Sequence, residues 1–365
     1  MTYIMSNPTI SIVANFYKPA KYIPKLINSV LNQTFNDWEL ICVNDCSPQN
    51  DAEIISEFSN NPKANNRIRL INNQTNLGIS KAKKIGIDNA KGSYITFIDG
   101  DDWFEPQALE RLVKPALKYD LDYVQMNSRR AYPLGAKKTM TNIVHEYNHI
   151  INSKELIDKY FVSFFGINLI GVAYWGKLFK TEIVRNSEFQ FQNYPIGEDL
   201  LFNVHIFPLI QSAMFIDYVG YNWRFGGITS SETSINKCRQ MILDFIDIYR
   251  IKKQCADKLN YTKAYIPMHI ELKNILKGNF SALAKFSQND CKSLEIKKFI
   301  ADILSIDDYT LNISKLLSND KYKNDKFIIA ISQKDIDTIY NICNAIYKQN
   351  WKHRLIKQTL RLLNF

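Results

Sequence analysis

Strand-like and helix-like segments alternate over the first 126 residues, and this alternation limits the possible folds more than any other feature of the sequence. The strand-like runs are short and rich in β-branched and aromatic residues, and the segments between them carry apolar residues at helical spacing. Strands joined by helices in this way form βαβ units and a mostly parallel sheet, with the carboxyl ends of the strands at one edge. Strands are expected at 9–16, 38–43, 67–71, 93–98 and 123–126, and helices at 20–32, 51–58, 79–89 and 106–119.

The pattern changes further along the chain. Residues 127–235 are irregular and rich in aromatic residues, whereas helical spacing dominates from residue 236 onward, apart from a strand-like run at 327–331. Residues 236–365 also hold half of the 46 lysines and arginines but only about a third of the 36 acidic residues, so they carry the whole surplus of +10. We therefore expect an α/β domain at 1–235 and a basic, mainly helical region at 236–365.

The basic region allows two interpretations. Its charge predicts an anionic partner, and a helical projection of residues 351–363 separates apolar from basic side chains, as in helices that lie on an anionic membrane surface. A lysine-rich solvated surface, with this helix packed on its own protein, explains the same pattern.

Targeting and redox features favour a cytoplasmic protein, soluble or peripheral on the cytoplasmic face of the inner membrane. The first residues lack the basic flank and apolar run of a signal peptide, and no stretch reaches the roughly eighteen apolar residues of a membrane span. The cysteines are scattered, as is typical of reduced thiols. They are Cys42, Cys46, Cys238, Cys255, Cys291 and Cys343.

The strongest chemical feature is an expected strand that runs directly into Asp99, Gly100, Asp101 and Asp102. Carboxylates this close repel one another unless a cation neutralises them. Oxygen ligands suit Mg²⁺ or Mn²⁺, and such an ion can also hold a diphosphate and stabilise it as a leaving group. An acidic turn that caps the next helix is the structural alternative, and we favour the metal site.

Two further acidic positions gain meaning from their places in the chain. Asp45 ends the second expected strand, so it should lie at the same sheet edge as Asp99, although an Asx-turn would explain it equally well. Glu198 and Asp199 precede an apolar run, where a carboxylate could serve as a general base or simply cap a helix.

Eight runs of residues carry a resemblance to a known family: 10–17, 39–45, 76–78, 91–92 and 97–102, followed by the weaker 175–178, 197–199 and 221–224. In this order and spacing they resemble the family 2 inverting glycosyltransferases of the GT-A fold. The resemblance is specific over about 9–110, where five separate elements agree, and weaker up to about 231, so the C-terminal region lies outside it.

The resemblance implies roles for individual residues. Tyr17 would stack on uracil and Asp45 would hydrogen-bond it, Asp99 and Asp101 would act at the metal and diphosphate, and Asp199 would be the catalytic base. Lys83 stands where the family often has arginine, so it can supply charge but not a fork of donors. The other implied site residues are Gly100 and Arg224 at the nucleotide sugar, with Asp102, Glu198 and Trp175 near them.

The implied reaction moves a hexose or N-acetylhexosamine from a UDP-sugar to a hydroxyl of a saccharide or lipid-linked acceptor, with Mn²⁺ or Mg²⁺. A bacterial setting in surface polysaccharide or lipooligosaccharide assembly is also implied. Residues 1–126 would bind the nucleotide sugar and 127–235 the acceptor, and no nucleic acid partner is expected. The resulting fold class is a Rossmann-like GT-A domain, with helices on both faces of its sheet, followed by the helical region.

Two rival functions remain. A non-catalytic nucleotide-sugar-binding scaffold is disfavoured because Asp45, Asp99, Asp101 and Asp199 are all present. A sugar-phosphate nucleotidyltransferase would normally have a glycine-rich loop after the first strand, and residues 15–22 contain no glycine.

Residues 145–149 match the H-E-x-x-H pattern of zinc proteases. That pattern needs a helix to bring both imidazoles to one face, and the surrounding composition favours a strand or loop.

Overall fold

The structure is a computed structural model that describes residues 7–132, 135–192, 194, 197–225, 234–286 and 290–363, without the side chains of 307, 308 and 350–363. The chain divides into two compact units, Met1–Ser230 and Ser231–Phe365. The interpretation of residues 1–6 and the two faces expected for the helix at 351–363 lie outside this description.

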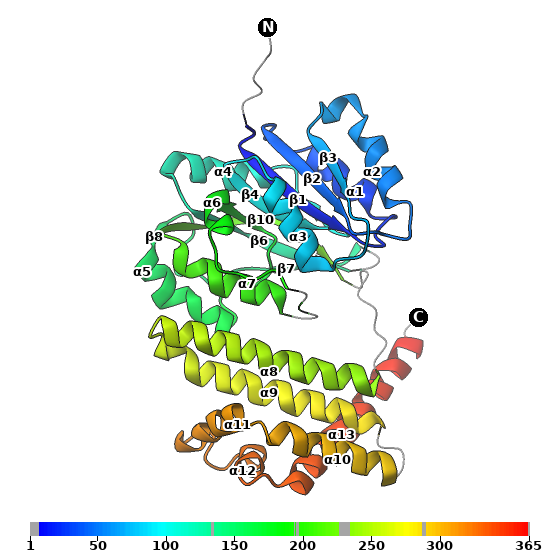
Figure 1. Cartoon of the computed structure of the whole chain (residues 1–365), viewed down its shortest axis with the longest axis vertical. Coiled ribbons are helices and arrows are strands. Elements are labelled where there is room, and N and C mark those ends of the chain that lie inside the picture. Colours follow the sequence, from blue (N-terminus) through cyan, green and yellow to red (C-terminus); the bar gives the residue numbers. More distant parts are fainter. Residues whose placement is uncertain are drawn as a thin grey trace. The chain divides into compact units, whose positions relative to one another are not determined.

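Within its described residues, the first unit is built on a ten-stranded sheet with the order β3-β2-β1-β4-β9-β6-β10-β5 (Figure 1). Strand β7 pairs with β6, and β8 pairs with β10. The strands are β1 (Ile10–Phe16), β2 (Trp38–Asn44), β3 (Ile68–Asn72), β4 (Tyr94–Asp99), β5 (Trp103–Phe104), β6 (Tyr123–Ala131), β7 (Lys137–Met140), β8 (Ile150–Asn152), β9 (Lys177–Lys180) and β10 (Ser212–Arg224).

Strands β1 to β4 form one parallel part of this sheet, and β6 and β10 form another. Strand β1 pairs in parallel with β2 and β4, and β2 pairs in parallel with β3. Asn15 lies opposite Asp99, and Phe16 lies opposite Asn44, so the ends of three strands meet at one edge. Later strands add antiparallel pairs, such as β9 with β4 and β6. The expected α/β fold with a mostly parallel sheet is confirmed.

Helices cover the sheet and bury their apolar sides against it. Helix α3 packs on β1 and β2, and α4 packs on β6 and β10 (Figure 1). The α-helices of this unit are α1 (Ile23–Leu31), α2 (Asp51–Ser59), α3 (Ile79–Asn89), α4 (Ala108–Tyr119), α5 (Ser153–Glu155), α6 (Thr181–Arg185) and α7 (Glu198–Ile206). Shorter turns are the 3₁₀ segments Pro62–Ala64, Phe161–Phe165 and Phe207–Leu209 and the π-helical Leu156–Tyr160.

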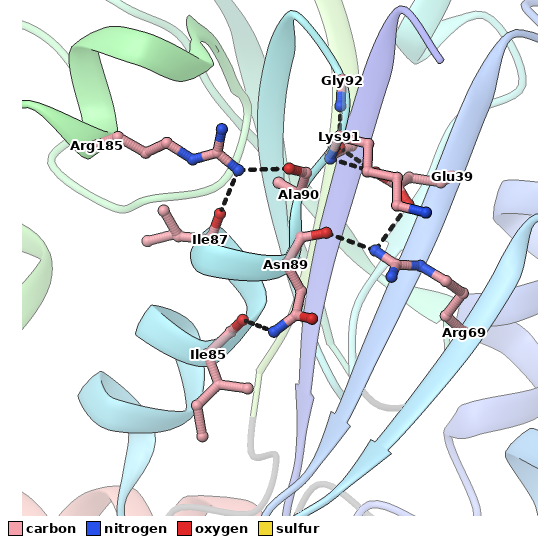
Figure 2. A network of polar contacts seen from close by, with 10 residues as sticks. Glu39, Arg69, Ile85, Ile87, Asn89, Ala90, Lys91, Gly92 and Arg185 are labelled. Carbon is pink, nitrogen blue, oxygen red and sulfur yellow. Dashed lines mark hydrogen bonds and ion pairs between the residues drawn. The ribbon is translucent and has the colours of Figure 1, made fainter. Parts of the chain in front are cut away.

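A polar network fixes the carboxyl end of α3 to the amino ends of the strands (Figure 2). Glu39 of β2 forms an ion pair with Arg69 of β3 at 2.9 Å and accepts a hydrogen bond from the Lys91 backbone N–H at 2.6 Å. Arg185 donates to the carbonyl oxygen of Ala90, just beyond the helix. Because one end of α3 is held here, its other end has a fixed position at the opposite edge of the sheet.

The second unit is helical throughout its described residues, so the expected helical C-terminal region is confirmed. Helices α8 and α9 pack along each other, and α13 packs on α9, α10 and α12 (Figure 1). Its helices are α8 (Ile235–Lys258), α9 (Tyr265–Leu283), α10 (Asp290–Leu304), α11 (Asp307–Ser314), α12 (Lys326–Ser332) and α13 (Ile336–Leu363), with 3₁₀ turns at Thr262–Ala264, Ala284–Phe286 and Lys315–Ser318.

The strand expected at 327–331 is wrong, because this segment lies in helix α12. Asp325 caps the helix by accepting hydrogen bonds from the backbone N–H groups of Phe327 and Ile328. A short apolar run has the same composition in a strand and in a buried helix, and here the cap and the packing on α11 and α13 decide for the helix. Throughout the described parts of the chain, each helix is too short or too polar to cross a membrane.

Candidate functional site

A cavity of about 670 Å³ lies at the edge where the parallel strands end. Its walls come from the ends of β1, β2 and β4, the start of α3 and the end of β10. Six of the residues expected at a nucleotide sugar line this one cavity: Tyr17, Asp45, Asp99, Gly100, Asp101 and Arg224.

Asp45 is 4% exposed, and both of its carboxylate oxygens hold the loop that leads into α3. Oδ1 accepts hydrogen bonds from Asn73 Nδ2 at 2.8 Å and from the Leu77 backbone N–H at 2.9 Å. Oδ2 accepts from the backbone N–H of Gly78 at 2.8 Å. Gly78 has φ 86°, a left-handed conformation that favours glycine. Asp45 therefore positions one wall of the cavity, whatever else it contacts.

The acidic turn after β4 places its carboxylates in two different environments. Asp99 and Asp101 line the cavity, with Gly100 between them. A Cβ atom on Gly100 would lie 2.8 Å from the carbonyl oxygen of Asn15, so only glycine allows the turn to approach β1 this closely. The turn is thus packed directly against the end of the first strand.

Asp102 is 1% exposed and is absent from the described lining of the cavity. Its Oδ2 accepts a hydrogen bond from the Tyr221 hydroxyl at 2.7 Å, and its Oδ1 accepts from the Arg224 backbone N–H at 2.8 Å. Burial and the nearby Asp99 and Asp101 raise the pKa of Asp102 well above its usual range, although these two hydrogen bonds oppose the shift. Asp102 joins the acidic turn to β10.

Two aromatic contacts support the same turn. Trp175 stacks on Tyr221 with ring centroids 4.4 Å apart and an angle of 3° between the rings. The Arg224 guanidinium lies over the Tyr22 ring at 4.2 Å, and its Nε donates to the carbonyl oxygen of Asp101 at 2.9 Å. Arg224 is therefore fixed beside the acidic turn while it lines the cavity, whereas Trp175 contributes through Tyr221.

Lys83 lies in a buried charge cluster beside the cavity. It is 4% exposed, and its Nζ lies 3.6 Å from Glu198 Oε1 and 3.9 Å from Asp199 Oδ1. The same ammonium lies 4.1 Å from the centre of the Tyr174 ring. Burial opposes its charge, but Glu198, Asp199 and Asp99 outweigh burial and raise the pKa of Lys83. Lys83 thus links α3 to α7.

Asp199 lies in the first turn of α7, and its side chain is 40% exposed. Loss of solvation, together with the charges of Asp99 and Glu198, raises its pKa to about 7, while Lys83 opposes this change. A carboxylate with a pKa near neutrality is suited to accept a proton. Asp199 is not part of the described cavity wall. The negative charge of Asp99, which does line that wall, helps to raise the pKa of Asp199.

Sequence reasoning did not single out Lys177 and Asn203 as site residues. Lys177 is fully buried, and its Nζ donates to Asn203 Oδ1 at 2.7 Å. Asn203 Nδ2 donates in turn to the Asp199 carbonyl oxygen at 2.6 Å. Burial lowers the pKa of Lys177 to about 7. A single lysine in a sequence normally predicts a solvated side chain. Only the packing shows that Lys177 is buried and supports α7 through Asn203.

The described residues contain no cluster of three or more His, Cys, Asp or Glu able to enclose a metal ion. Asp99 and Asp101 do supply two carboxylates at the cavity wall, and Mg²⁺ or Mn²⁺ is commonly held by one or two carboxylates plus substrate phosphates. The donor set therefore fits an ion that binds together with a nucleotide diphosphate. Residues 145–149 form a loop and turn rather than a helix, so the structure does not support a zinc-protease site there.

Comparison with known proteins gives consistent results. The family model described as "Glycosyl transferase family 2" matches residues 11–171. The uncharacterized glycosyltransferase EpsJ of Bacillus subtilis is 29% identical over 320 residues, which cover 82% of this chain and 84% of EpsJ. A cholesterol galactosyltransferase of Borreliella burgdorferi is 25% identical over 314 residues, 76% of this chain and 86% of that protein.

The crystal structure of S. aureus TarS 1-349 in complex with UDP-GlcNAc has the same fold. It superposes with a TM-score of 0.60 at 15% sequence identity, covering 94% of this chain and 92% of that chain. The sheet edge and the acidic turn agree with these comparisons: residues 11–171 match glycosyl transferase family 2, and the chain has the GT-A type of fold.

Proposed function

We propose that this glycosyltransferase moves a hexose or N-acetylhexosamine from a UDP-sugar to a hydroxyl group of a saccharide or lipid-linked acceptor, with inversion at the anomeric carbon. The observation that carries the proposal is the gathering of Tyr17, Asp45, Asp99 and Asp101 on the wall of one 670 Å³ cavity. Its volume suits a ligand of nucleotide-sugar size. TarS, crystallised with UDP-GlcNAc and with UDP, supports the choice of a uridine nucleotide.

The donor would lie along this wall. Tyr17 is 40% exposed and offers an aromatic face to the uracil ring, with Asp45 beside it. Asp99 and Asp101 would hold Mn²⁺ or Mg²⁺, which would neutralise the charge that develops on the diphosphate as it leaves. Arg224 lines the same end and adds a fixed positive charge.

Asp199 would accept the proton of the acceptor hydroxyl. Its raised pKa, near 7, means that the group is partly ionised at neutral pH and becomes a good proton acceptor. The positive charge of Lys83 offsets the negative charges of Glu198 and Asp199, because its Nζ atom lies within 4 Å of both carboxylates. Residues 127–235 would contact the acceptor.

Bacterial surface polysaccharide or lipooligosaccharide synthesis is the proposed setting. The relatives compared above are bacterial glycosyltransferases, one of them named for a galactosyl transfer to cholesterol. No disulfide joins any of the six cysteines, all of which lie within the described residues, and this suits a reducing cytoplasm. A peripheral position on the inner membrane, through the basic C-terminal helix, is part of the same proposal.

A panel of UDP-sugars with Mn²⁺, scored for UDP release, tests this proposal. The wild type should release UDP with at least one donor, and Asp101→Asn and Asp199→Asn should each lower kcat by about a hundredfold or more. Asp320→Asn is the matched control, because the Asp320 side chain is 97% exposed in the second unit. Wild-type rates in both Asp101→Asn and Asp199→Asn would refute the assigned roles.

A further inference from the structure

The helical second unit contains a cavity of its own, of about 500 Å³. Helices α8 and α9, the end of α11 and the 3₁₀ turn Lys315–Ser318 surround it. Lys253, Tyr265, His269, Asn312 and Lys315 are among its lining residues. All of them belong to the second unit, so the cavity exists independently of the transferase site.

His269 is a buried polar residue in the wall of this cavity. It is 5% exposed, and among the described residues its Nε2 atom has no hydrogen-bond partner. A buried polar atom without a hydrogen bond destabilises the fold, so such atoms normally pair with water or a ligand. Burial and the positive charges of Lys315 and Lys253 lower the pKa of His269 to about 4. The imidazole is therefore neutral at pH 7 and keeps one N–H group in the wall of the cavity.

Two lysines from different elements give the cavity a positive charge. Lys253 of α8 pairs with Asp257 at 2.6 Å, and Asp257 also accepts a hydrogen bond from the Tyr265 hydroxyl at 2.7 Å. Lys315 donates to Asn312 Oδ1 at 2.9 Å, a neutral partner that leaves its charge uncompensated. The two ammonium groups and one carboxylate leave a net positive charge beside His269.

The remaining wall offers a flat face and polar groups. The Tyr265 ring is nearly parallel to the His269 ring, with centroids 6.4 Å apart and an angle of 6°. Asn312, Ser318 and Asn319 add amide and hydroxyl groups to the lining. Aromatic faces pack well on the C–H faces of sugars, and the polar groups suit their hydroxyls.

We propose that this cavity is a second ligand site, which binds an oxyanion carried on a small hydroxylated molecule, such as a sugar bearing a phosphate or a carboxylate. The oxyanion would accept hydrogen bonds from Lys315 and from His269 Nε2. The proposal goes beyond the transferase reaction and does not depend on it.

Nuclear magnetic resonance of the histidine rings of the full chain tests the proposal. The probes are inorganic phosphate, glucose 1-phosphate, glucuronate and uncharged glucose, with the His269 signal identified by its loss in His269→Phe. Saturating UDP is added in a parallel series to fill the transferase cavity. We expect glucose 1-phosphate and glucuronate to shift the His269 signal with and without UDP, and glucose to leave it unchanged. The tighter of the two charged probes identifies the group as phosphate or carboxylate.

Lys315→Gln should weaken this binding by roughly tenfold, the value of one charge-assisted hydrogen bond. Lys315 is exposed, so this variant keeps the fold even if His269→Phe does not. Lys298→Gln, an exposed lysine on α10, is the matched control and should bind as the wild type does. The proposal fails if no anion moves the His269 signal, if glucose moves it equally, or if Lys315→Gln and wild type bind with equal affinity.

Discussion

The Tyr221 hydroxyl donates a hydrogen bond to Oδ2 of Asp102 across 2.7 Å, although the two residues are 119 positions apart. The Tyr221 hydroxyl oxygen also accepts a hydrogen bond from the backbone N–H of Asp99 at 3.1 Å. A single phenol therefore joins the end of β4 to Asp102 of the acidic turn. This contact fixes the direction in which Asp99 and Asp101 face the cavity.

Tyr221→Phe should lower the free energy of unfolding by about 1–3 kcal/mol, because it leaves a buried carboxylate oxygen and a backbone N–H group unsatisfied. The donor KM should rise as well, because the acidic turn loses its hydrogen bonds with the Tyr221 hydroxyl. Urea unfolding and UDP-release kinetics measure both effects. Tyr119→Phe, on an exposed ring of α4, should stay within about 0.5 kcal/mol of wild type, and an equal loss in both variants would show that the hydrogen bond is unimportant.

Gly100→Ala should disrupt the acidic turn, because its new methyl group would lie 2.8 Å from the Asn15 carbonyl oxygen and 3.2 Å from the Phe16 ring. Backbone cannot retreat as a flexible side chain can, so we expect a loss of about 2 kcal/mol or more in stability and of most donor binding. Gly278→Ala is the matched control, since a methyl group there meets nothing within 4 Å in helix α9. That change should stabilise the protein by up to about 1 kcal/mol. Thermal unfolding of both variants measures these changes in stability. An unchanged stability in Gly100→Ala would contradict the close approach of Gly100 to the Asn15 carbonyl oxygen.

Asp45→Asn should raise the donor KM by roughly tenfold with a smaller effect on kcat, because the amide replaces an acceptor that faces the N–H groups of Leu77 and Gly78. Hydrogen exchange at the start of α3 should become faster, which a role in uracil contact alone would not cause. Asp88→Asn, an exposed change at the other end of the same helix, should leave both measurements unchanged. Unaltered exchange in Asp45→Asn would show that Asp45 does not hold this loop.

The rate of transfer should rise with pH through about 7, because Asp199 must be ionised to accept a proton and its pKa lies near 7. The acidic limb of the kcat profile between pH 5.5 and 8 gives this value, with roughly tenfold loss per pH unit below it. Lys83→Gln removes the positive charge that opposes the shift, so the limb should move to higher pH. A flat profile in the wild type, with chemistry rate-limiting, would rule out Asp199 as the base.

Local chemistry made much of the first unit predictable from sequence. The helix expected at 79–89 has these bounds in the structure, because a glycine precedes it and the Lys91-Gly92 turn follows it. The gathering of Asp45 and Asp99 also followed from the rule that parallel strands end at one edge. By contrast, β6 extends to Ala131, beyond the expected 126, because β7 and β10 pair with its later residues.

The parts that sequence could not give depend on partners distant along the chain. Lys83 was expected at the nucleotide sugar, yet its contacts are Glu198 and Asp199, more than a hundred residues away. Asp101 and Asp102 are neighbours in the sequence, and only the hydrogen bonds from β10 show that Asp102 has a buried place of its own. Lys177 was not predicted as a site residue, because only the packing beside α7 shows that its side chain is buried.

Lys177 should make stability depend on pH in an unusual direction. Its pKa is lowered by burial from 10.5 to about 7, so above pH 7 the folded state holds a neutral amine while the unfolded chain still binds a proton. The unfolded state then binds more protons, and stability rises with pH from about 7 toward 10, by at most about 1.4 kcal/mol per unit.

Lys177→Met removes this titration and keeps a similar volume. The wild type should therefore gain stability relative to Lys177→Met between pH 7 and 9 in urea unfolding. Lys298→Met, at an exposed lysine, controls for charge loss, and a wild-type curve parallel to that of Lys177→Met would mean that Lys177 keeps its ordinary pKa in the folded protein.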